Sequence, residues 1–290
     1  MTGAQTGGTG PVGRVAVVGG GTMGAGITHV LLAAGLPVTL VEASPDDLAR
    51  ARQQVAASLD RAAARGRLDR PAAEVLAGLT GTVDVADLAG AGLVIEAVPE
   101  DPALKGVVLP AVEAAAGPAA VVATNTSSLS IDELAAGLRR PERFVGMHFF
   151  NPVPASALVE VVRGRATSPE ALAAAHRLAA LAGKETIEIA DSPGFATSRL
   201  GVAIGLEAIR MVQEGVGTPE DIDKAMVLGY RYPMGPLRLG DLVGLDVRLS
   251  IAEYLHARLG DRFDPPELLR RMVAEGRLGK KTGRGFYNWD

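Results

Sequence analysis

Four histidines occur in the 290 residues, and one of them stands where a proton acceptor would be useful. His148 ends a predicted strand, Phe144–His148, whereas His29, His176 and His256 lie in predicted helices. Ligands of open α/β sheets bind beyond the carboxyl ends of the strands. Because an unperturbed imidazole has a pKa of about 6.5, histidine is suited to taking a proton near neutral pH. The sequence therefore indicates His148 as a catalytic base and the other three as structural or solvated residues.

An acid lies twelve residues beyond this histidine, at Glu160 in the predicted strand Leu158–Val162. Apolar residues flank it, so its side chain is either on an exposed face or placed deliberately inside the protein. A carboxylate beside a histidine can select its tautomer and stabilise the imidazolium formed when it takes a proton. If Glu160 points inward, it is the expected partner of His148.

A polar cluster, Thr124-Asn125-Thr126-Ser127-Ser128, follows the predicted strand 120–124. At the carboxyl end of a strand, its hydroxyl groups could bind a substrate hydroxyl or carbonyl. The same residue types also cap helices, here one beginning at Leu129. Both interpretations are compatible with the local sequence.

A glycine-rich turn, Gly-Gly-Gly-Thr-Met-Gly, lies between the predicted strand 15–18 and the predicted helix 22–34. In the pattern G-x-G-x-x-G, the first glycine permits the turn and the second lets backbone approach a pyrophosphate. The third lets the helix pack closely on the strand. Glu42 ends the next strand, where a carboxylate bonds ribose hydroxyls and repels a 2′-phosphate. We therefore expect NAD as the cofactor, held by Gly19, Gly21, Thr22, Met23, Gly24 and Glu42.

Strands and helices must alternate to place these residues. Short apolar strands are predicted at 15–18, 38–41, 93–97, 120–124, 144–148, 158–162 and 186–189. Helices are predicted at 22–34, 45–65, from 70, at 102–115 and at 168–182. Short buried strands separated by helices are typical of an open α/β sheet.

The pattern changes after Asp191-Ser192-Pro193-Gly194. From Phe195 onward the periodicity is helical, with a helix start at Thr218–Asp221 and further helical segments at 236–259 and 265–275. We expect a domain boundary near 192, with an α/β domain over 13–192 and an all-helical domain over 193–290. Residues 1–12, rich in Gly and Thr, are expected to form a disordered tail.

Composition restricts the class of protein. The formal net charge of −4 does not suggest a nucleic-acid binder, which usually carries a basic face. The chain has no cysteine, which excludes disulfides, thiolate metal sites and a cysteine nucleophile, and fits a reducing compartment. No apolar run reaches the roughly 20 residues that cross a bilayer, and the N-terminus lacks the pattern of a signal peptide. We expect a cytoplasmic protein with no membrane, nucleic-acid or metal partner.

Taken together, these segments resemble the 3-hydroxyacyl-CoA dehydrogenase family, in particular its short single-function members. The resemblance covers roughly residues 13–290 and is carried, in order, by VAVVGGGTMGAGI, VIEAVPED, ATNTSSLSI, FVGMHFFNPVP, LVEVV, DSPGFATSRL, YPMGPLRLGDLVGLD and GKKTGRGFYNW. It implies a Rossmann-like, mostly parallel sheet domain that binds NAD. It also implies a helical C-terminal domain for dimerisation and substrate binding. The implied activity, in fatty acid metabolism, is the reversible oxidation of a short-chain 3-hydroxyacyl-CoA.

The resemblance also implies roles for individual residues. His148 would be the base, Glu160 its partner, and Ser127 a contact to the substrate oxygen and the nicotinamide. Further positions around the cofactor would be Glu100, Lys105, Asn125, Asn151 and Lys281. Positions that touch CoA would be Ser58, Arg65 and Lys105. Ser58 and Arg65 lie seven residues apart, two turns of the predicted helix, so that both could face one ligand.

One position departs from the family pattern. The segment after Pro-Gly-Phe usually has an active-site Asn directly before an Arg, and here Ser198 precedes Arg199. A serine can donate one hydrogen bond but lacks the second group of an amide. The departure concerns the substrate more than the reaction, which leaves open the same chemistry on a substrate bound to acyl-carrier protein.

Two more distant alternatives exist. The β-hydroxyacid dehydrogenase family shares the glycine-rich turn but relies on a lysine base, against which the His148 and Glu160 pair argues. The other alternative is a dinucleotide-binding protein without catalysis, since a fold does not by itself imply an activity.

Overall fold

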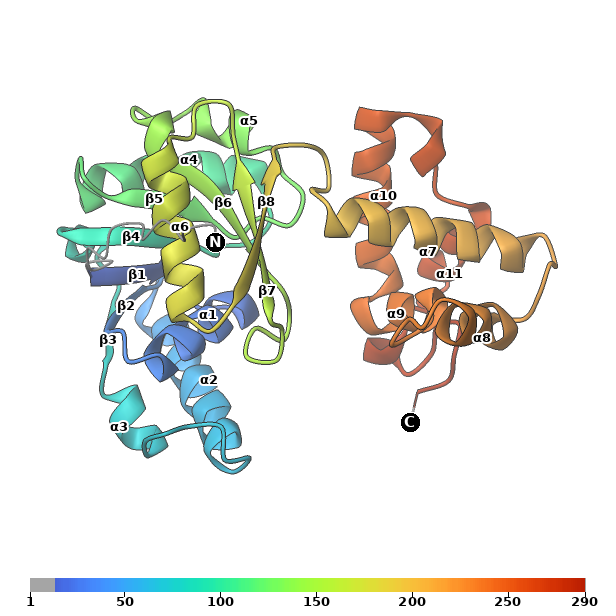
Figure 1. The fold of residues 1–290 in the computed structure, drawn as a ribbon, viewed down its shortest axis with the longest axis horizontal. Coiled ribbons are helices and arrows are strands. Elements are labelled where there is room, and N and C mark those ends of the chain that lie inside the picture. The colour runs from blue at the N-terminus through green and yellow to red at the C-terminus, as the bar shows by residue number, and fades with distance from the viewer. Residues whose placement is uncertain (1–13, 290) are drawn as a thin grey trace, which may run out of the picture. The chain divides into compact units, whose positions relative to one another are not determined.

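The computed structural model describes residues 14–289 (Figure 1), so the tail predicted at 1–12 lies outside the described residues. The chain divides into two compact units, with the division between Asp191 and Ser192. Among the described residues, no helix combines the length and the apolar character needed to cross a bilayer.

The first unit contains a sheet of eight strands in the order β3-β2-β1-β4-β5-β6-β7-β8. All neighbouring strands are parallel except β6 and β7, which are antiparallel, so the predicted mostly parallel sheet is confirmed. The strands are β1 (Arg14–Val18), β2 (Val38–Val41), β3 (Leu79–Thr82), β4 (Ala91–Glu96), β5 (Val121–Thr124), β6 (Phe144–Phe149), β7 (Leu158–Arg163) and β8 (Glu185–Ala190).

One strand, β3, was not predicted from the sequence. Its residues Leu-Thr-Gly-Thr bury only the leucine, so the segment has no apolar run that would mark a strand. It forms at the edge of the sheet, because β2 supplies a parallel partner for its backbone. The strand therefore depends on a tertiary contact and not on its own sequence pattern.

The helices of the first unit are α1 (Thr22–Ala33), α2 (Pro45–Ala63), α3 (Ala72–Leu76), α4 (Pro102–Ala116), α5 (Ile131–Ala135) and α6 (Pro169–Leu181), with short 3-10 turns η1 (Val85–Leu88) and η2 (Pro141–Arg143). Ser44, Asp101 and Ser168 begin α2, α4 and α6, and each accepts a hydrogen bond from a backbone N–H of the first turn. A proline follows each cap at the first helical position, where its missing N–H costs nothing.

The two faces of the sheet have different roles. Leu93, Ile95, Met147 and Val161 belong to the core that also contains residues of α1 and α6, and Figure 1 shows α6 crossing in front of the strands. Because successive side chains of a strand point to opposite faces, their neighbours point to the other face. Those neighbours at the strand ends are polar, and they are Glu96, Thr124, His148 and Glu160.

The strand order reverses beside β1. After β1 the chain builds β2 and β3 on one side and then crosses back to place β4 on the other side. Such a reversal leaves a crevice at the carboxyl ends of the strands, which is where open α/β sheets bind ligands. The glycine-rich turn leaves β1 at this point, and Glu96 ends β4 beside it.

The second unit is helical, with α7 (Thr197–Gln213), α8 (Pro219–Gly229), α9 (Pro236–Val243), α10 (Leu245–Leu259) and α11 (Glu267–Ala274), and the turns η3 (Asp261–Phe263) and η4 (Lys280–Thr282). The helical segment predicted at 236–259 is divided into α9 and α10, because Gly244 has a φ of +105°, which a helix cannot contain. Asp241 of α9 is buried, and its carboxylate accepts hydrogen bonds from the backbone N–H groups of Phe286 and Tyr287. These bonds hold the C-terminal segment in place.

Candidate active site

His148 and Glu160 lie opposite each other on the antiparallel strands β6 and β7. Nδ1 of His148 is 2.7 Å from Oε2 of Glu160, whose side chain is fully buried. The ring of Phe150 packs against the imidazole with 4.4 Å between the centroids. When the buried carboxylate accepts the proton of Nδ1, Nε2 is left as a proton acceptor. Glu160 therefore points inward and contacts His148, which is the arrangement expected of a base with an orienting acid.

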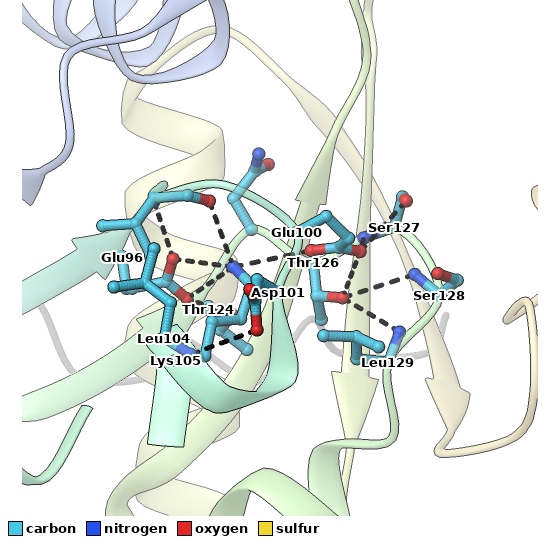
Figure 2. A network of polar contacts seen from close by, with 12 residues as sticks. Glu96, Glu100, Asp101, Leu104, Lys105, Thr124, Thr126, Ser127, Ser128 and Leu129 are labelled. Carbon is cyan, nitrogen blue, oxygen red and sulfur yellow. Dashed lines mark hydrogen bonds and ion pairs between the residues drawn. The ribbon is translucent and has the colours of Figure 1, made fainter. Parts of the chain in front are cut away.

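The loop after β5 is held by one carboxylate oxygen. Oε1 of Glu100 accepts from the Thr126 hydroxyl at 2.6 Å, the Ser127 backbone N–H at 2.8 Å and the Ser127 hydroxyl at 3.2 Å (Figure 2). Three hydrogen bonds to one charged acceptor fix the path of the backbone as well as the direction of the serine side chain. Glu100 and Ser127, which the resemblance placed near the cofactor, are thus in direct contact.

The helix-capping interpretation of the polar cluster is wrong for α5. The residue that caps this helix is Ser130, which lies beyond the cluster and accepts from the backbone N–H of Glu133. The Thr126 hydroxyl instead accepts from the N–H groups of Ser128 and Leu129 within a polar turn (Figure 2).

Lys105, in α4, is only 1% exposed, although lysines are rarely buried unless they are paired. Its Nζ donates to both oxygens of Glu96, at 2.7 and 2.9 Å, and lies 3.5 Å from Oε2 of Glu100. Glu96 also accepts from the Thr124 hydroxyl at 2.6 Å and from the Val98 backbone N–H at 2.7 Å. The amino group is therefore held inside the first unit, and its contacts with cofactor and CoA stay predictions.

The glycine-rich turn fits a dinucleotide phosphate. Gly19 has a φ of +92°, and a Cβ on Gly24 would lie 1.7 Å from the carbonyl oxygen of Gly19, so both positions require glycine. At Gly21, by contrast, a Cβ would meet nothing within 4 Å, so the backbone is open to an approaching group. Gly21 begins α1 without a side-chain cap, which leaves its first N–H groups and the positive end of its dipole for an anion.

Glu42 follows β2 beside this turn. One of its carboxylate oxygens accepts from the Gly20 backbone N–H and the other from the Ala43 N–H at 3.1 Å. The carboxylate is therefore anchored next to the glycine-rich turn, at the place where the acid of a dinucleotide fold meets the ribose hydroxyls.

Asn125 joins the carboxyl ends of three strands. Its side-chain oxygen accepts from the Phe149 N–H of β6 at 2.9 Å, and its backbone N–H donates to the Glu96 carbonyl of β4 at 2.8 Å. Asn151 lies exposed in the turn that follows β6. Lys184 supports this turn by donating to the backbone carbonyls of Val153 and Ser156, at 2.7 and 2.6 Å.

Two of the three residues expected to touch CoA, Ser58 and Arg65, lie in and just after α2. The structure ends α2 at Ala63, two residues before the predicted end, and Arg65 lies exposed in the turn that follows, so that Ser58 and Arg65 facing one ligand stays a prediction. The Ser58 hydroxyl lies 2.8 Å from Nδ1 of His29 in α1. Burial, together with the nearby charges of Lys184 and Arg61, lowers the pKa of His29 from 6.5 to about 4, so it is neutral at pH 7. Contacts of Ser58 and Arg65 with CoA stay predictions.

Two expected site residues belong to the second unit. Ser198 lies in the first turn of α7, and Lys281 lies in η4, where its Nζ donates to Asp246 at 2.6 Å. Their contacts with substrate and cofactor stay predictions.

Sequence reasoning missed Glu96. The signal was present, because the strand Ala91–Glu96 is an apolar run that ends in an acid and is fully buried from Leu93 onward. A carboxylate at the end of a buried strand needs donors, and the lysine that supplies them lies nine residues away in the next helix. Only the fold shows that this lysine points at the strand end and not at solvent.

Comparison with known proteins agrees with this geometry. Residues 14–192 match the model of the 3-hydroxyacyl-CoA dehydrogenase NAD binding domain, and residues 194–289 match that of the 3-hydroxyacyl-CoA dehydrogenase C-terminal domain. A 3-hydroxybutyryl-CoA dehydrogenase of Mycobacterium tuberculosis strain H37Rv is 44% identical over 280 residues, which cover 95% of this chain and 98% of the relative. One from Bradyrhizobium diazoefficiens is 41% identical over 278 residues, covering 95% of each chain.

A solved structure extends the likeness to the fold. The crystal structure of (S)-3-hydroxybutyryl-CoA dehydrogenase PaaH1 from Ralstonia eutropha superimposes with a TM-score of 0.91 and is 42% identical, over 95% of this chain and 98% of that chain.

Proposed function

Because this chain belongs to the 3-hydroxyacyl-CoA dehydrogenase family, we propose that it oxidises a short-chain 3-hydroxyacyl-CoA reversibly to the 3-ketoacyl-CoA, with NAD⁺ as cofactor. 3-Hydroxybutyryl-CoA is the proposed substrate, since the relatives carry that name. The observation that carries the proposal is the buried pair of His148 and Glu160, at the carboxyl end of β6 and the neighbouring amino-terminal part of the antiparallel strand β7. The family assignment rules out the lysine-dependent alternative and disfavours a protein without catalysis.

In the proposed mechanism, Nε2 of His148 takes the proton of the substrate 3-hydroxyl. The fully buried carboxylate of Glu160 stabilises the imidazolium that results and keeps the ring in place. Bound NAD⁺ supplies the acceptor for the hydride that leaves C3. Ser127, whose backbone N–H and hydroxyl both donate to Glu100, is proposed to steady the substrate oxygen. The reverse reduction uses the same groups.

The test is the oxidation of NADH in the presence of acetoacetyl-CoA. His148→Ala is expected to lower kcat by about 10²–10⁴-fold, because a positioned general base contributes that much. His176→Ala is the matched control, since that histidine lies in α6 and contacts Thr186 and Glu188 of β8, and it should keep the wild-type rate within twofold. A wild-type protein that binds NADH but turns over no acetoacetyl-CoA would refute the assignment.

The carrier-protein alternative is tested in the same assay. Acetoacetyl-CoA and acetoacetyl groups loaded on an acyl-carrier protein are compared at equal concentration. We expect the CoA thioester to have the higher kcat/KM. A preference of tenfold or more for the carrier-protein substrate would instead favour the alternative that Ser198 left open.

We also propose that the protein is a homodimer associated through its second unit. Apolar side chains stand exposed there on α7, α8, α9 and α10 and next to them, and they include Leu200, Val216, Leu228, Tyr230, Leu239, Leu242, Val243 and Val247. Exposed apolar surface of this kind is typical of an interface. Light scattering after size exclusion should give about twice the chain mass of 29.8 kDa, and Leu228→Asp should shift the measured mass toward that of one chain.

The cytoplasm is the proposed location, because the cysteine-free composition fits a reducing compartment.

A further inference from the structure

The carboxylate of Glu96 is surrounded by donors. It ends β4 with no exposed surface, and it receives two contacts from Lys105, one from the Thr124 hydroxyl and one from the Val98 N–H. An unpaired charge in such a place would be costly, so the arrangement persists only because each oxygen is satisfied. The Lys105 ammonium and the Val98 N–H can only donate, so the residue at this position must offer them acceptor oxygens. A glutamine amide would turn its NH₂ toward a donor.

The ammonium of Lys105 is shared unequally between two acids. It lies within 2.9 Å of both oxygens of Glu96 but 3.5 Å from the nearest oxygen of Glu100 (Figure 2). Glu96 is fully buried, whereas the Glu100 side chain is 36% exposed. Glu96 is therefore the main ion-pair partner of Lys105. Glu100 is attracted to the ammonium but does not form a hydrogen bond with it.

Because Lys105 pairs mainly with Glu96, Oε1 of Glu100 can accept hydrogen bonds from the loop that follows β5. Oε2 faces Lys105, while Oε1 accepts all three hydrogen bonds from Thr126 and Ser127. If Glu96 lost its charge, Glu100 would be the only carboxylate beside the ammonium. Its carboxylate would then be drawn toward Lys105, and the hydrogen bonds that orient the Ser127 hydroxyl would lengthen or break.

We propose that Glu96 is a positioning residue for the reaction: it holds the charge of Lys105 so that Glu100 can orient Ser127. The inference rests on the proposed function, in which Ser127 steadies the substrate oxygen. Glu96 touches no reacting atom, and it acts through Lys105 and Glu100. It adds to the His148 and Glu160 pair a second buried acid on the same face of the sheet, with a different task.

A double-mutant cycle tests the proposal, with kcat and KM measured for acetoacetyl-CoA and NADH. Glu96→Gln and Ser127→Ala are each expected to lower kcat about tenfold, with KM changed less than threefold. If Glu96 acts through Ser127, the double variant should be no slower than Ser127→Ala alone, since interacting residues are not additive. A double variant about 100-fold slower than wild type would overturn the proposal, because independent losses multiply.

Two further variants keep the test decisive. Glu113→Gln neutralises another buried acid of the first unit, in α4. That acid accepts from the backbone N–H groups of Arg139 and Arg140, and the variant should keep kcat within twofold. If Glu96→Gln does not fold, Thr124→Val removes one hydrogen bond from Glu96 at unchanged charge. Thr124→Val should then lower kcat two- to fivefold when introduced into the wild type and leave kcat unchanged when introduced into Ser127→Ala. An equal loss in both backgrounds would overturn the proposal.

The outcomes separate this inference from the proposed function. An inactive wild type would refute both, whereas an active wild type with additive effects of the two substitutions would refute the inference alone.

Discussion

Lowering the pH should destabilise the first unit through His29. This histidine lies in α1, is 4% exposed, and contacts the Ser58 hydroxyl. Burial, followed by the charges of Lys184 and Arg61, lowers its pKa to about 4 in the folded protein. In the unfolded chain the imidazole has its ordinary pKa of 6.5. Between these two values the unfolded chain binds a proton that the folded protein does not, so stability is lost as the pH falls.

The size of the loss follows from the shift. One pKa unit corresponds to about 1.4 kcal/mol. From neutral pH to pH 5 the free energy of unfolding should therefore fall by about 2 kcal/mol through His29 alone, and by about 3 kcal/mol once pH 4 is reached. His29→Gln removes the titrating group and keeps an amide that can contact Ser58. In this variant the free energy of unfolding should therefore not show the fall of about 2 kcal/mol between neutral pH and pH 5 that is due to His29.

Amide hydrogen exchange measures the difference locally. Peptides from β4, which contains no substituted residue, are compared between wild type and His29→Gln at pH 7.5 and at pH 5.0. At one pH both proteins share the same intrinsic exchange rates, so the ratio of their rates reports their difference in stability. This ratio should change by about 30-fold between the two pH values, which corresponds to about 2 kcal/mol. Peptides from the second unit serve as an internal control, and a ratio in β4 that changes less than threefold would refute the reasoning.

Three more predictions concern the cofactor loop, the base and the second unit. Gly24→Ala places a Cβ within 1.7 Å of the Gly19 carbonyl oxygen, so NADH affinity measured by fluorescence should fall more than tenfold, and unchanged affinity would contradict the proposed fit. Glu160→Gln should lower kcat about 10³–10⁴-fold without loss of NADH binding, because the orienting charge is removed; a loss below tenfold would argue against its role. Asp241→Asn weakens hydrogen bonds from Phe286, Tyr287 and Trp289, and should cost about 2–4 kcal/mol, measured by urea unfolding followed through Trp289 fluorescence.

Much of the fold follows from local patterns. Seven of the eight strands were predicted, and six of these are short apolar runs, because a strand buried on both faces must be apolar throughout, whereas β8 at the edge of the sheet is mostly exposed. The caps at Ser44, Asp101 and Ser168 lie within one residue of the predicted helix starts, since a cap acts on the next few backbone N–H groups. The break at Gly244 was not predicted, because the residues on both sides of it have helical periodicity and only the backbone conformation of the glycine separates α9 from α10.

The sequence by itself determined the chemistry that each segment could offer. The glycine-rich turn, Glu42 after the second strand and His148 at the end of another are all consequences of spacing within one stretch of chain. The tertiary structure decided which charged groups of separate elements meet, including the inward direction of Glu160 that the sequence left open. His148 meets Glu160 because β6 and β7 pair antiparallel in one register, and Lys105 meets Glu96 because α4 packs back over the strand it follows. Such pairings depend on how separate elements dock, and the alternation of apolar and polar residues within one element does not specify this docking.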